Sequence, residues 1–147
     1  NPERNKLVEN CFHILHSYDI VHPKEYGIDI DEIKDIAKEN GVDWSFHHVN
    51  TLETEIPICD TIFFDTDHTY EQLSQEIKLH ANKAGKFLAF HDTSRYGGEL
   101  IPAINEFLTE NTEWHVLHCE NLCQGLTVLI KAPLEEIKDA GISVFDE

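Results

Sequence analysis

The sequence predicts an α/β fold with a mostly parallel sheet and a C-terminal antiparallel hairpin. Apolar, strand-like runs alternate with amphipathic helical segments along the chain. The helical segment between the runs 61–65 and 86–90 has the length that a right-handed parallel crossover requires. A short loop containing Asn and Gly joins the runs 114–119 and 126–130, which indicates a hairpin. The chain has 147 residues, so we expect one domain over residues 1–147.

The elements are assigned in order from periodicity and from residues that start or stop them. The expected elements are helix 1–10, strand 14–20, helix 31–40, strand 43–49, strand 61–65, helix 69–84, strand 86–90, helix 100–108, strands 114–119 and 126–130, and a helical turn after Pro133. Pro23 argues against regular structure in 21–27, and Gly41 ends the preceding helix. Thr69 and Gln72 predict a capping box at the start of the long crossover helix.

Composition excludes several classes of function. The formal net charge is −17, from 28 acidic and 11 basic residues, so the chain repels nucleic-acid backbones. It contains no long apolar run of the kind that a membrane helix or a secretory signal needs. The four cysteines form no C-x-x-C pair and are expected to be free thiols in a reducing cytoplasm. A small-molecule partner, with neither nucleic acid nor membrane, is therefore expected.

Acidic and imidazole side chains follow two strands at the point where each one ends. Asp65, Asp67 and His68 come after the strand 61–65, and His91 and Asp92 come after the strand 86–90. Neighbouring parallel strands lie about 4.8 Å apart and end at the same edge of a sheet. We therefore expect these side chains to converge at the carboxyl edge, where open α/β folds bind ligands.

Four motifs in a fixed order resemble one family. They are F-F-D-T-D-H-T-Y at 63–70, G-K-F-L-A-F-H-D-T at 85–93, A-I-N-E-F-L at 103–108 and Q-G-L-T-V-L at 124–129. Together they resemble the C-terminal part of a class I S-adenosylmethionine-dependent methyltransferase, and most of all the subgroup of small sugar and natural-product O-methyltransferases. The resemblance covers roughly residues 14–131. It implies a Rossmann-like sheet and methyl transfer from S-adenosylmethionine to an oxygen of a small molecule or sugar.

The resemblance also implies which residues bind the cofactor. Asp19, with its neighbour Ile20, stands where the family holds the ribose hydroxyls, and a carboxylate can accept hydrogen bonds from two hydroxyls. The segment Asn50-Thr51-Leu52 stands where the family meets the adenine, although an aspartate is commoner than asparagine there. Asp65 would face the sulfonium and methyl region. The alternative for Asp19 is a simple turn residue.

Catalytic and metal-binding roles are expected at the carboxyl edge. His68 or His91 is the candidate general base, because imidazole titrates near the working pH, and Asp65 would order the site. In the alternative, His68 caps a helix and His91 fills a polar pocket. Metal-dependent relatives bind a divalent ion at the places that Asp65, His91 and Asp92 occupy. Two carboxylates and an imidazole suit Mn²⁺, Fe²⁺ or Zn²⁺ better than Mg²⁺.

One element of the family pattern is missing from this chain. No first strand with a glycine-rich G-x-G turn precedes Ile14, and no G-x-G occurs anywhere among the seven glycines. The chain also lacks methionine, even at position 1. Three explanations are open: the chain is part of a longer protein, another segment or copy fills the gap, or the protein has lost cofactor binding. The functional alternatives are accordingly a methyltransferase-like scaffold without catalysis, or a metal-dependent hydrolase.

Overall fold

The computed structural model describes residues 14–95 and 98–141, so the helix expected in 1–10 lies outside the described residues. The chain divides into two compact units, residues 1–54 and 55–147, and each is described by itself. The expectation of a single domain stays a prediction.

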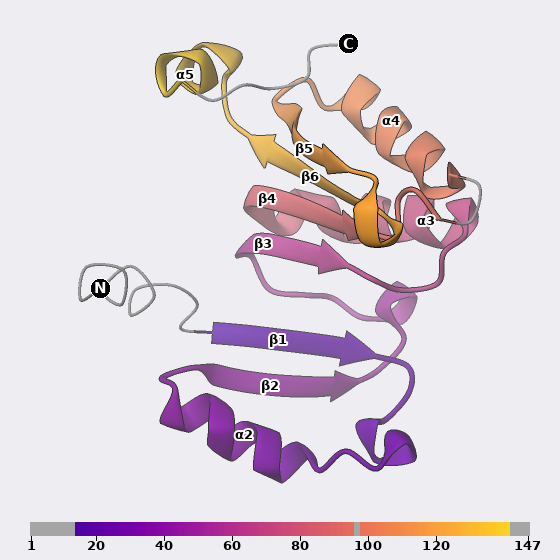
Figure 1. Cartoon of the computed structure of the whole chain (residues 1–147), viewed down its shortest axis with the longest axis vertical. Coiled ribbons are helices and arrows are strands. Elements are labelled where there is room, and N and C mark those ends of the chain that lie inside the picture. Colours follow the sequence, from indigo (N-terminus) through magenta and orange to yellow (C-terminus); the bar gives the residue numbers. More distant parts are fainter. Residues whose placement is uncertain (1–13, 96–97, 142–147) are drawn as a thin grey trace. The chain divides into compact units, whose positions relative to one another are not determined.

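The first unit is built on a pair of parallel strands. β1 (Ile14–Asp19) pairs with β2 (Asp43–His48) in one continuous register, from Ile14 opposite Asp43 to Asp19 opposite His48. Helix α2 (Ile30–Glu39) connects the two strands (Figure 1). Both strands and the helix lie within two residues of the predicted positions, so the β-α-β assignment of this segment is confirmed.

The segment after β1 corrects one expectation. Residues 21–27 were expected to lack regular structure because of Pro23, yet Pro23–Tyr26 form a short 3₁₀ helix. Proline is compatible with the first position of a helix, where its missing N–H has no partner to lose. The Nδ1 atom of His22 accepts a hydrogen bond from the Lys24 backbone N–H at 3.2 Å and caps this turn. A second 3₁₀ turn, Thr51–Glu53, also lies in a segment expected to be loop.

No described residue of the first unit is buried. On α2, Ile33 and Ala37 are half-buried as expected, but Ile36 is 53% exposed although its spacing assigns it to the same face. The helix ends as predicted, with Gly41 in the left-handed conformation at φ +75°. Residues 14–54 therefore have the expected local structure but contribute no buried core.

The second unit contains a four-stranded sheet with two covering helices (Figure 1). Its elements are β3 (Cys59–Phe64), α3 (Tyr70–His80), β4 (Ala84–His91), α4 (Leu100–Glu110), β5 (Trp114–Glu120), β6 (Leu126–Lys131) and α5 (Leu134–Asp139). The strand order is β3-β4-β6-β5. β3 and β4 run parallel, with Phe64 opposite Phe90, whereas β6 is antiparallel to both β4 and β5. The predicted crossover, the predicted hairpin and the α/β fold class are confirmed.

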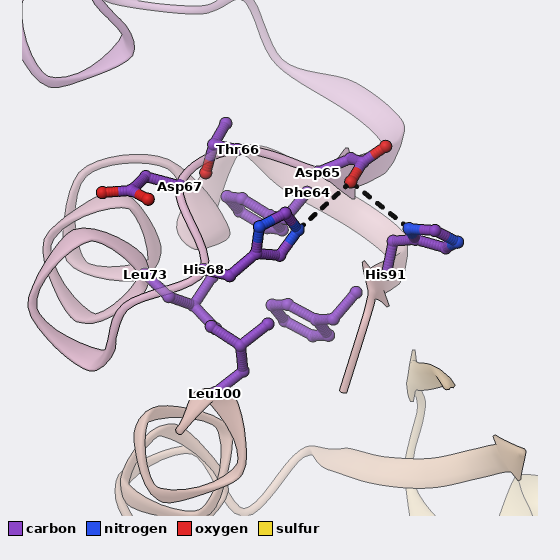
Figure 2. A pocket seen from close by; sticks show the side chains of 9 residues that line it. Phe64, Asp65, Thr66, Asp67, His68, Leu73, His91 and Leu100 are labelled. Atoms are coloured by element: carbon purple, nitrogen blue, oxygen red, sulfur yellow. Dashed lines mark ion pairs between the residues drawn. The ribbon is translucent and has the colours of Figure 1, made fainter. Parts of the chain in front are cut away.

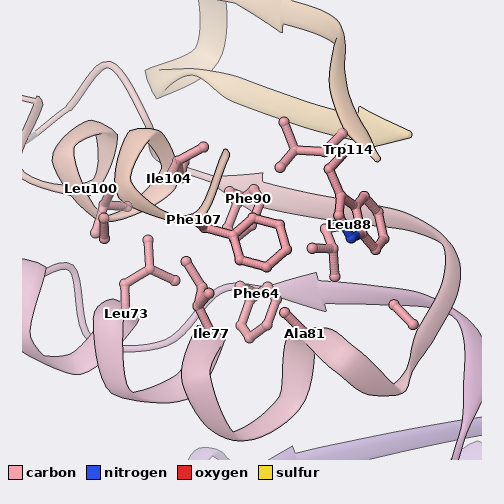
Figure 3. Close-up of a cluster of buried hydrophobic side chains, with 13 residues drawn as sticks. Phe64, Leu73, Ile77, Ala81, Leu88, Phe90, Leu100, Ile104, Phe107 and Trp114 are labelled. Atoms are coloured by element: carbon pink, nitrogen blue, oxygen red, sulfur yellow. The ribbon is translucent and has the colours of Figure 1, made fainter. Parts of the chain in front are cut away.

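The core of the second unit lies between the sheet and helices α3 and α4 (Figure 3). The rings of Phe64 and Phe90 stack across the parallel pair with their centroids 5.1 Å apart. Leu88 and Leu129 are fully buried in the same layer. Burial of each such side chain stabilises the fold by about 1.5–3 kcal/mol. Because Phe64 and Phe90 are each the last or next-to-last residue of their strand, the core fixes the strand ends that carry the polar groups.

Helix α3 begins with half of the predicted capping box. Thr69 Oγ1 accepts a hydrogen bond from the Gln72 backbone N–H at 3.3 Å, as expected. The side chain of Gln72 does not return to Thr69 but donates from Nε2 to Oε1 of Glu76 at 3.0 Å. The reciprocal hydrogen bond of a capping box is therefore replaced by a contact within the helix. Within the described ranges, no helix is both long and apolar enough to span a bilayer.

Candidate functional site

The carboxyl ends of β3 and β4 meet at one edge of the sheet, because the two strands are parallel neighbours. Asp65 and His68 follow β3 directly, and His91 and Asp92 close β4. Figure 2 shows Asp65 between the imidazoles of His68 and His91. The convergence expected from the strand ends is thus present for these four side chains.

Carboxylates and imidazoles alternate around this cluster. His68 Nε2 lies 2.8 Å from Asp92 Oδ2 and 3.7 Å from Asp65 Oδ1. His91 Nδ1 lies 3.3 Å from Asp65 Oδ1 and 3.2 Å from Asp92 Oδ1. Each imidazole thus faces both carboxylates, so a proton or a cation bound at this edge interacts with the whole cluster.

The two carboxylates differ in their exposure to water. The Asp92 side chain is 8% exposed, whereas that of Asp65 is 47% exposed. Asp92 also has a left-handed backbone with φ +58°, which a non-glycine residue rarely adopts. Strained backbone conformations persist where the surrounding structure enforces them, and they gather at functional sites. Asp92 is therefore a buried, conformationally fixed anion, and Asp65 is its more accessible counterpart.

Close approach in this cluster is not matched by hydrogen bonding. His91 Nδ1 and Asp92 Oδ1 are both buried, and neither has a hydrogen-bond partner among the described residues. Nitrogen and oxygen atoms that lie close together without hydrogen-bond geometry are arranged as the ligands around a metal ion are. One donor atom each from Asp65, His68 and Asp92 lies within 4.8 Å of the others. The geometry therefore suits a bound cation as well as a shared proton.

The donors correspond in part to the expected metal ligands. Asp65, His91 and Asp92 were predicted as metal ligands from the sequence. The group in the structure contains Asp65 and Asp92 with His68 as its imidazole, and His91 lies beside it with Nδ1 3.3 Å from Asp65 Oδ1. The pocket at this edge has a volume of only about 10 Å³, close to the minimum for one water molecule. Its size suits an ion or a water, and it is too small to enclose a whole S-adenosylmethionine molecule.

Asp67 does not join the cluster, although its place in the sequence suggests that it should. Its side chain is exposed and points away from Asp65 in Figure 2. It stands two residues after Asp65, beyond the end of β3, so the strand no longer sets its direction. Asp67 therefore lines the same pocket as Asp65, His68 and His91, as expected, but the close group of Asp65, His68 and Asp92 does not include it.

Two residues next to the cluster were missed from the sequence. Thr66 donates a hydrogen bond from Oγ1 to Oε2 of Glu76 at 2.5 Å, and Glu76 is 1% exposed. An acidic residue in an amphipathic helix is ordinarily assigned to the solvent. The spacing of residues along α3 could have predicted the burial of Glu76. Glu76 shares a helical face with Leu73, Ile77 and His80, all of which are buried.

The residues expected to bind the adenosyl group lie in the first unit, where the structure shows their local roles. Asp19 Oδ1 accepts from the Val21 backbone N–H at 2.8 Å, which is the turn role considered as the alternative. Ile20 is 67% exposed, and its carbonyl oxygen lies 2.9 Å from His48 Nε2. The ligand roles of Asp19 and Ile20 stay predictions.

Asn50 has local partners at both ends of its amide. Its Oδ1 accepts from the Leu52 backbone N–H at 3.0 Å, and its Nδ2 donates to Glu53 Oε1 at 3.2 Å. Asn50 thereby caps the 3₁₀ turn Thr51–Glu53. Adenine recognition by the side chain of Asn50 would have to replace one of these contacts, and the adenine-binding roles of Asn50, Thr51 and Leu52 stay predictions.

A second loop supports the edge beside Asp92. The backbone N–H groups of Ser94 and Arg95 both donate to the Gln124 carbonyl, at 3.0 and 3.1 Å. The Arg95 guanidinium also contacts the Gln124 side chain. Below them, Thr127 Oγ1 donates to Thr93 Oγ1 at 3.0 Å in a buried position. Residues 93–95, which follow β4, are therefore held by hydrogen bonds to Gln124 and Thr127, which lie just before and within β6.

Comparison with known proteins supports the fold. No family model and no curated protein matches the sequence. Among solved structures, the chain is similar to a putative caffeoyl-CoA O-methyltransferase from Staphylococcus aureus, with a TM-score of 0.53 and 14% sequence identity. The match covers 89% of this chain and 82% of the other. At this identity the likeness shows the fold alone: the chain has an O-methyltransferase-like α/β fold.

Proposed function

We propose that the protein transfers a methyl group from S-adenosylmethionine to a hydroxyl oxygen of a small molecule, with sugars as one acceptor class. The observation that carries this proposal is the cluster of Asp65, His68, His91 and Asp92 at the carboxyl edge of a methyltransferase-like fold. In open α/β sheets that edge is where ligands bind. The motif order at 63–70 and 85–93 supports the same activity.

S-Adenosylmethionine is consumed in this reaction, so it is a substrate, and its sulfonium supplies an already activated methyl group. The protein has to align the acceptor oxygen and take its proton. His68 is the better placed base, because the buried carboxylate of Asp92 lies 2.8 Å from its Nε2. That contact favours a proton on Nε2 and a lone pair on Nδ1 in the neutral ring, and it stabilises the imidazolium that forms.

The same cluster fits a divalent cation. Asp65, His68 and Asp92 would hold it, with His91 beside them, and two carboxylates with imidazole suit Mn²⁺, Fe²⁺ or Zn²⁺. A cation there would polarise the acceptor hydroxyl and lower the pKa of that hydroxyl. His68 would then act as a ligand, and His91, whose side chain is 36% exposed, would be the candidate base.

The test begins with binding of S-adenosylhomocysteine, measured by calorimetry, followed by methyl transfer from labelled S-adenosylmethionine to a panel of hydroxyl compounds. We expect His68→Gln to lower the turnover rate by about a hundredfold while binding of S-adenosylhomocysteine is retained. His118→Gln is the matched control, since His118 is an exposed histidine on β5. Transfer at the full rate in His68→Gln would exclude His68 as base.

A second candidate function is metal-dependent hydrolysis. It is favoured by His91 Nδ1 and Asp92 Oδ1, which are buried without a hydrogen-bond partner among the described residues and could bind a metal ion. Metal analysis of the same purified protein separates the two functions. Bound metal that is lost in Asp65→Ala, in a protein that does not bind S-adenosylhomocysteine, would favour the hydrolase. Protein that binds neither metal nor S-adenosylhomocysteine would instead be a scaffold, in keeping with the absent G-x-G turn.

A further inference from the structure

Glu76 is an acidic side chain buried inside the second unit. It lies in the middle of α3, is 1% exposed, and is flanked on its face by Leu73 and Ile77. Acidic residues are almost never fully buried unless they are paired, because removing a carboxyl from water costs several kcal/mol without compensating hydrogen bonds. An apolar residue at this position would fill the space without that cost.

The hydrogen bonds of Glu76 lead toward the candidate site. Gln72 Nε2 donates to its Oε1 at 3.0 Å from within the same helix, whereas Thr66 Oγ1 donates to its Oε2 at 2.5 Å from outside the helix. Thr66 lies in the loop between β3 and α3, directly after Asp65 and two residues before His68. A partly buried hydrogen bond therefore joins α3 to the loop that carries Asp65 and His68, which are half of the cluster.

The loop needs such a contact because its backbone has no regular structure between Phe64 and Tyr70. Asp65 Oδ1 must lie 3.3 Å from His91 Nδ1, and His68 Nε2 must lie 2.8 Å from Asp92 Oδ2. A site held by loop residues retains such distances only when neighbouring side chains fix the loop. The cap by Thr69 fixes one end of the loop, and the hydrogen bond of Thr66 fixes its middle.

We propose that Glu76 is a positioning residue: its buried carboxyl holds Thr66, and through Thr66 it sets the places of Asp65 and His68 opposite His91 and Asp92. The consequence for turnover rests on the proposed methyl transfer at this edge, whereas the geometric consequence does not. In this proposal Glu76 acts through the loop, by way of Thr66.

A matched pair of variants tests the proposal in the whole chain. Thr66→Val and Gln72→Leu each remove one hydrogen bond to Glu76, but Thr66 lies in the loop that carries Asp65 and His68, whereas Gln72 lies within α3. The readout is the ¹⁵N chemical shifts of the His68 and His91 rings at one fixed neutral pH, without substrate. We expect Thr66→Val to move both sets of signals and Gln72→Leu to leave them in place.

The conservative variant Thr66→Ser keeps the hydroxyl and should restore the wild-type ring signals. If methyl transfer is observed, Thr66→Val should lower kcat by about tenfold with little change in the KM for the acceptor, because misplacement affects the reacting geometry more than binding. Thr66→Ala replaces the valine variant if that variant does not fold.

Unmoved ring signals in the variant without the hydroxyl would overturn the proposal. So would equal changes in Gln72→Leu or in Thr66→Ser, because these would trace the effect to helix stability or to the side-chain methyl group. Moved signals in Thr66→Val, in a protein with no methyl transfer at all, would support the positioning role while rejecting the proposed function.

Discussion

The non-glycine residues that have a left-handed backbone lie at the candidate site and in the loop joined to it. Asp92, Cys123 and Gln124 are the non-glycine residues with positive φ among those that the structure describes, and Gly125 follows them at φ +99°. The carbonyl of Gln124 accepts from the Ser94 backbone N–H at 3.0 Å, so these conformations meet where two loops are joined. Such strain is maintained only by surrounding contacts. The edge that carries Asp92 therefore depends on the loop before β6.

Gly125 is the residue at this junction that tolerates substitution least. A Cβ on Gly125 would overlap the backbone nitrogen and side chain of Ser94, and the φ of Gly125 is itself unfavourable for a side chain. We expect Gly125→Ala to lower the free energy of unfolding by about 2 kcal/mol or more, measured by urea denaturation. The control is Gly98→Ala, where φ is +77° but no atom lies within 4 Å of the added Cβ. Equal losses in both variants would show that the overlap with Ser94 contributes nothing.

Residues at strand ends were predictable, and residues that reach the site from a helix were not. Asp65, His91 and Asp92 were identified because parallel strands bring their carboxyl ends together whatever the loops do. Asp67 lines the pocket but points away from Asp65, because its direction depends on loop backbone that no periodicity describes. Glu76 was missed because an acidic residue in a helix is usually solvated. Its burial depends on packing across the whole second unit.

At the scale of elements, the helix and strand positions among the described residues were predicted to within about four residues, and the largest difference is at the end of α3, which is His80 where the sequence suggested residue 84. The errors have two causes. The 3₁₀ turns Pro23–Tyr26 and Thr51–Glu53 are held by single caps, from His22 and Asn50, which the periodicity of apolar residues does not register. β4 begins at Ala84 instead of Lys86 because Ala84 is buried and pairs with Cys59 across the sheet. Pairing between distant segments decided that boundary.

Helix α3 links β3 to β4, and its first turn adjoins the site. Thr69 Oγ1 satisfies the Gln72 N–H at the start of the helix. We expect Thr69→Ala to lower the free energy of unfolding by about 1 kcal/mol, as is usual for loss of an N-cap. Thr109→Ala is the control, because Thr109 Oγ1 donates to the Asn105 carbonyl within α4 and caps nothing. A loss in Thr109→Ala as large as that in Thr69→Ala would contradict a specific capping effect.

At the scale of the whole molecule, the two units differ in how much they bury. The second unit has a core in which Leu88, Phe90 and Leu129 are fully buried, whereas no described residue of the first unit is buried. The sequence did not reveal this difference, because β1 and β2 carry strand-like residues and α2 has an amphipathic pattern. A core requires a second apolar layer, and periodicity within one segment cannot show whether that layer is present.

This difference predicts a large contrast in amide hydrogen exchange. Amides of β4 and β6 exchange only when the core of the second unit opens, whereas those of β1 and β2 have no buried side chains to retain them. We expect β1, α2 and β2 to exchange at least about a hundredfold faster than β4 and β6, which corresponds to a stability difference of about 3 kcal/mol or more. The measurement is exchange of the whole chain followed by mass spectrometry of its peptides. Equal protection of peptides from 14–48 and from 84–91 would contradict the prediction and would mean that the first unit is held by contacts beyond the residues described.

Addition of S-adenosylhomocysteine extends the test, because binding by Asp19 and the segment 50–52 would slow exchange in the first unit, whereas binding elsewhere would leave it fast.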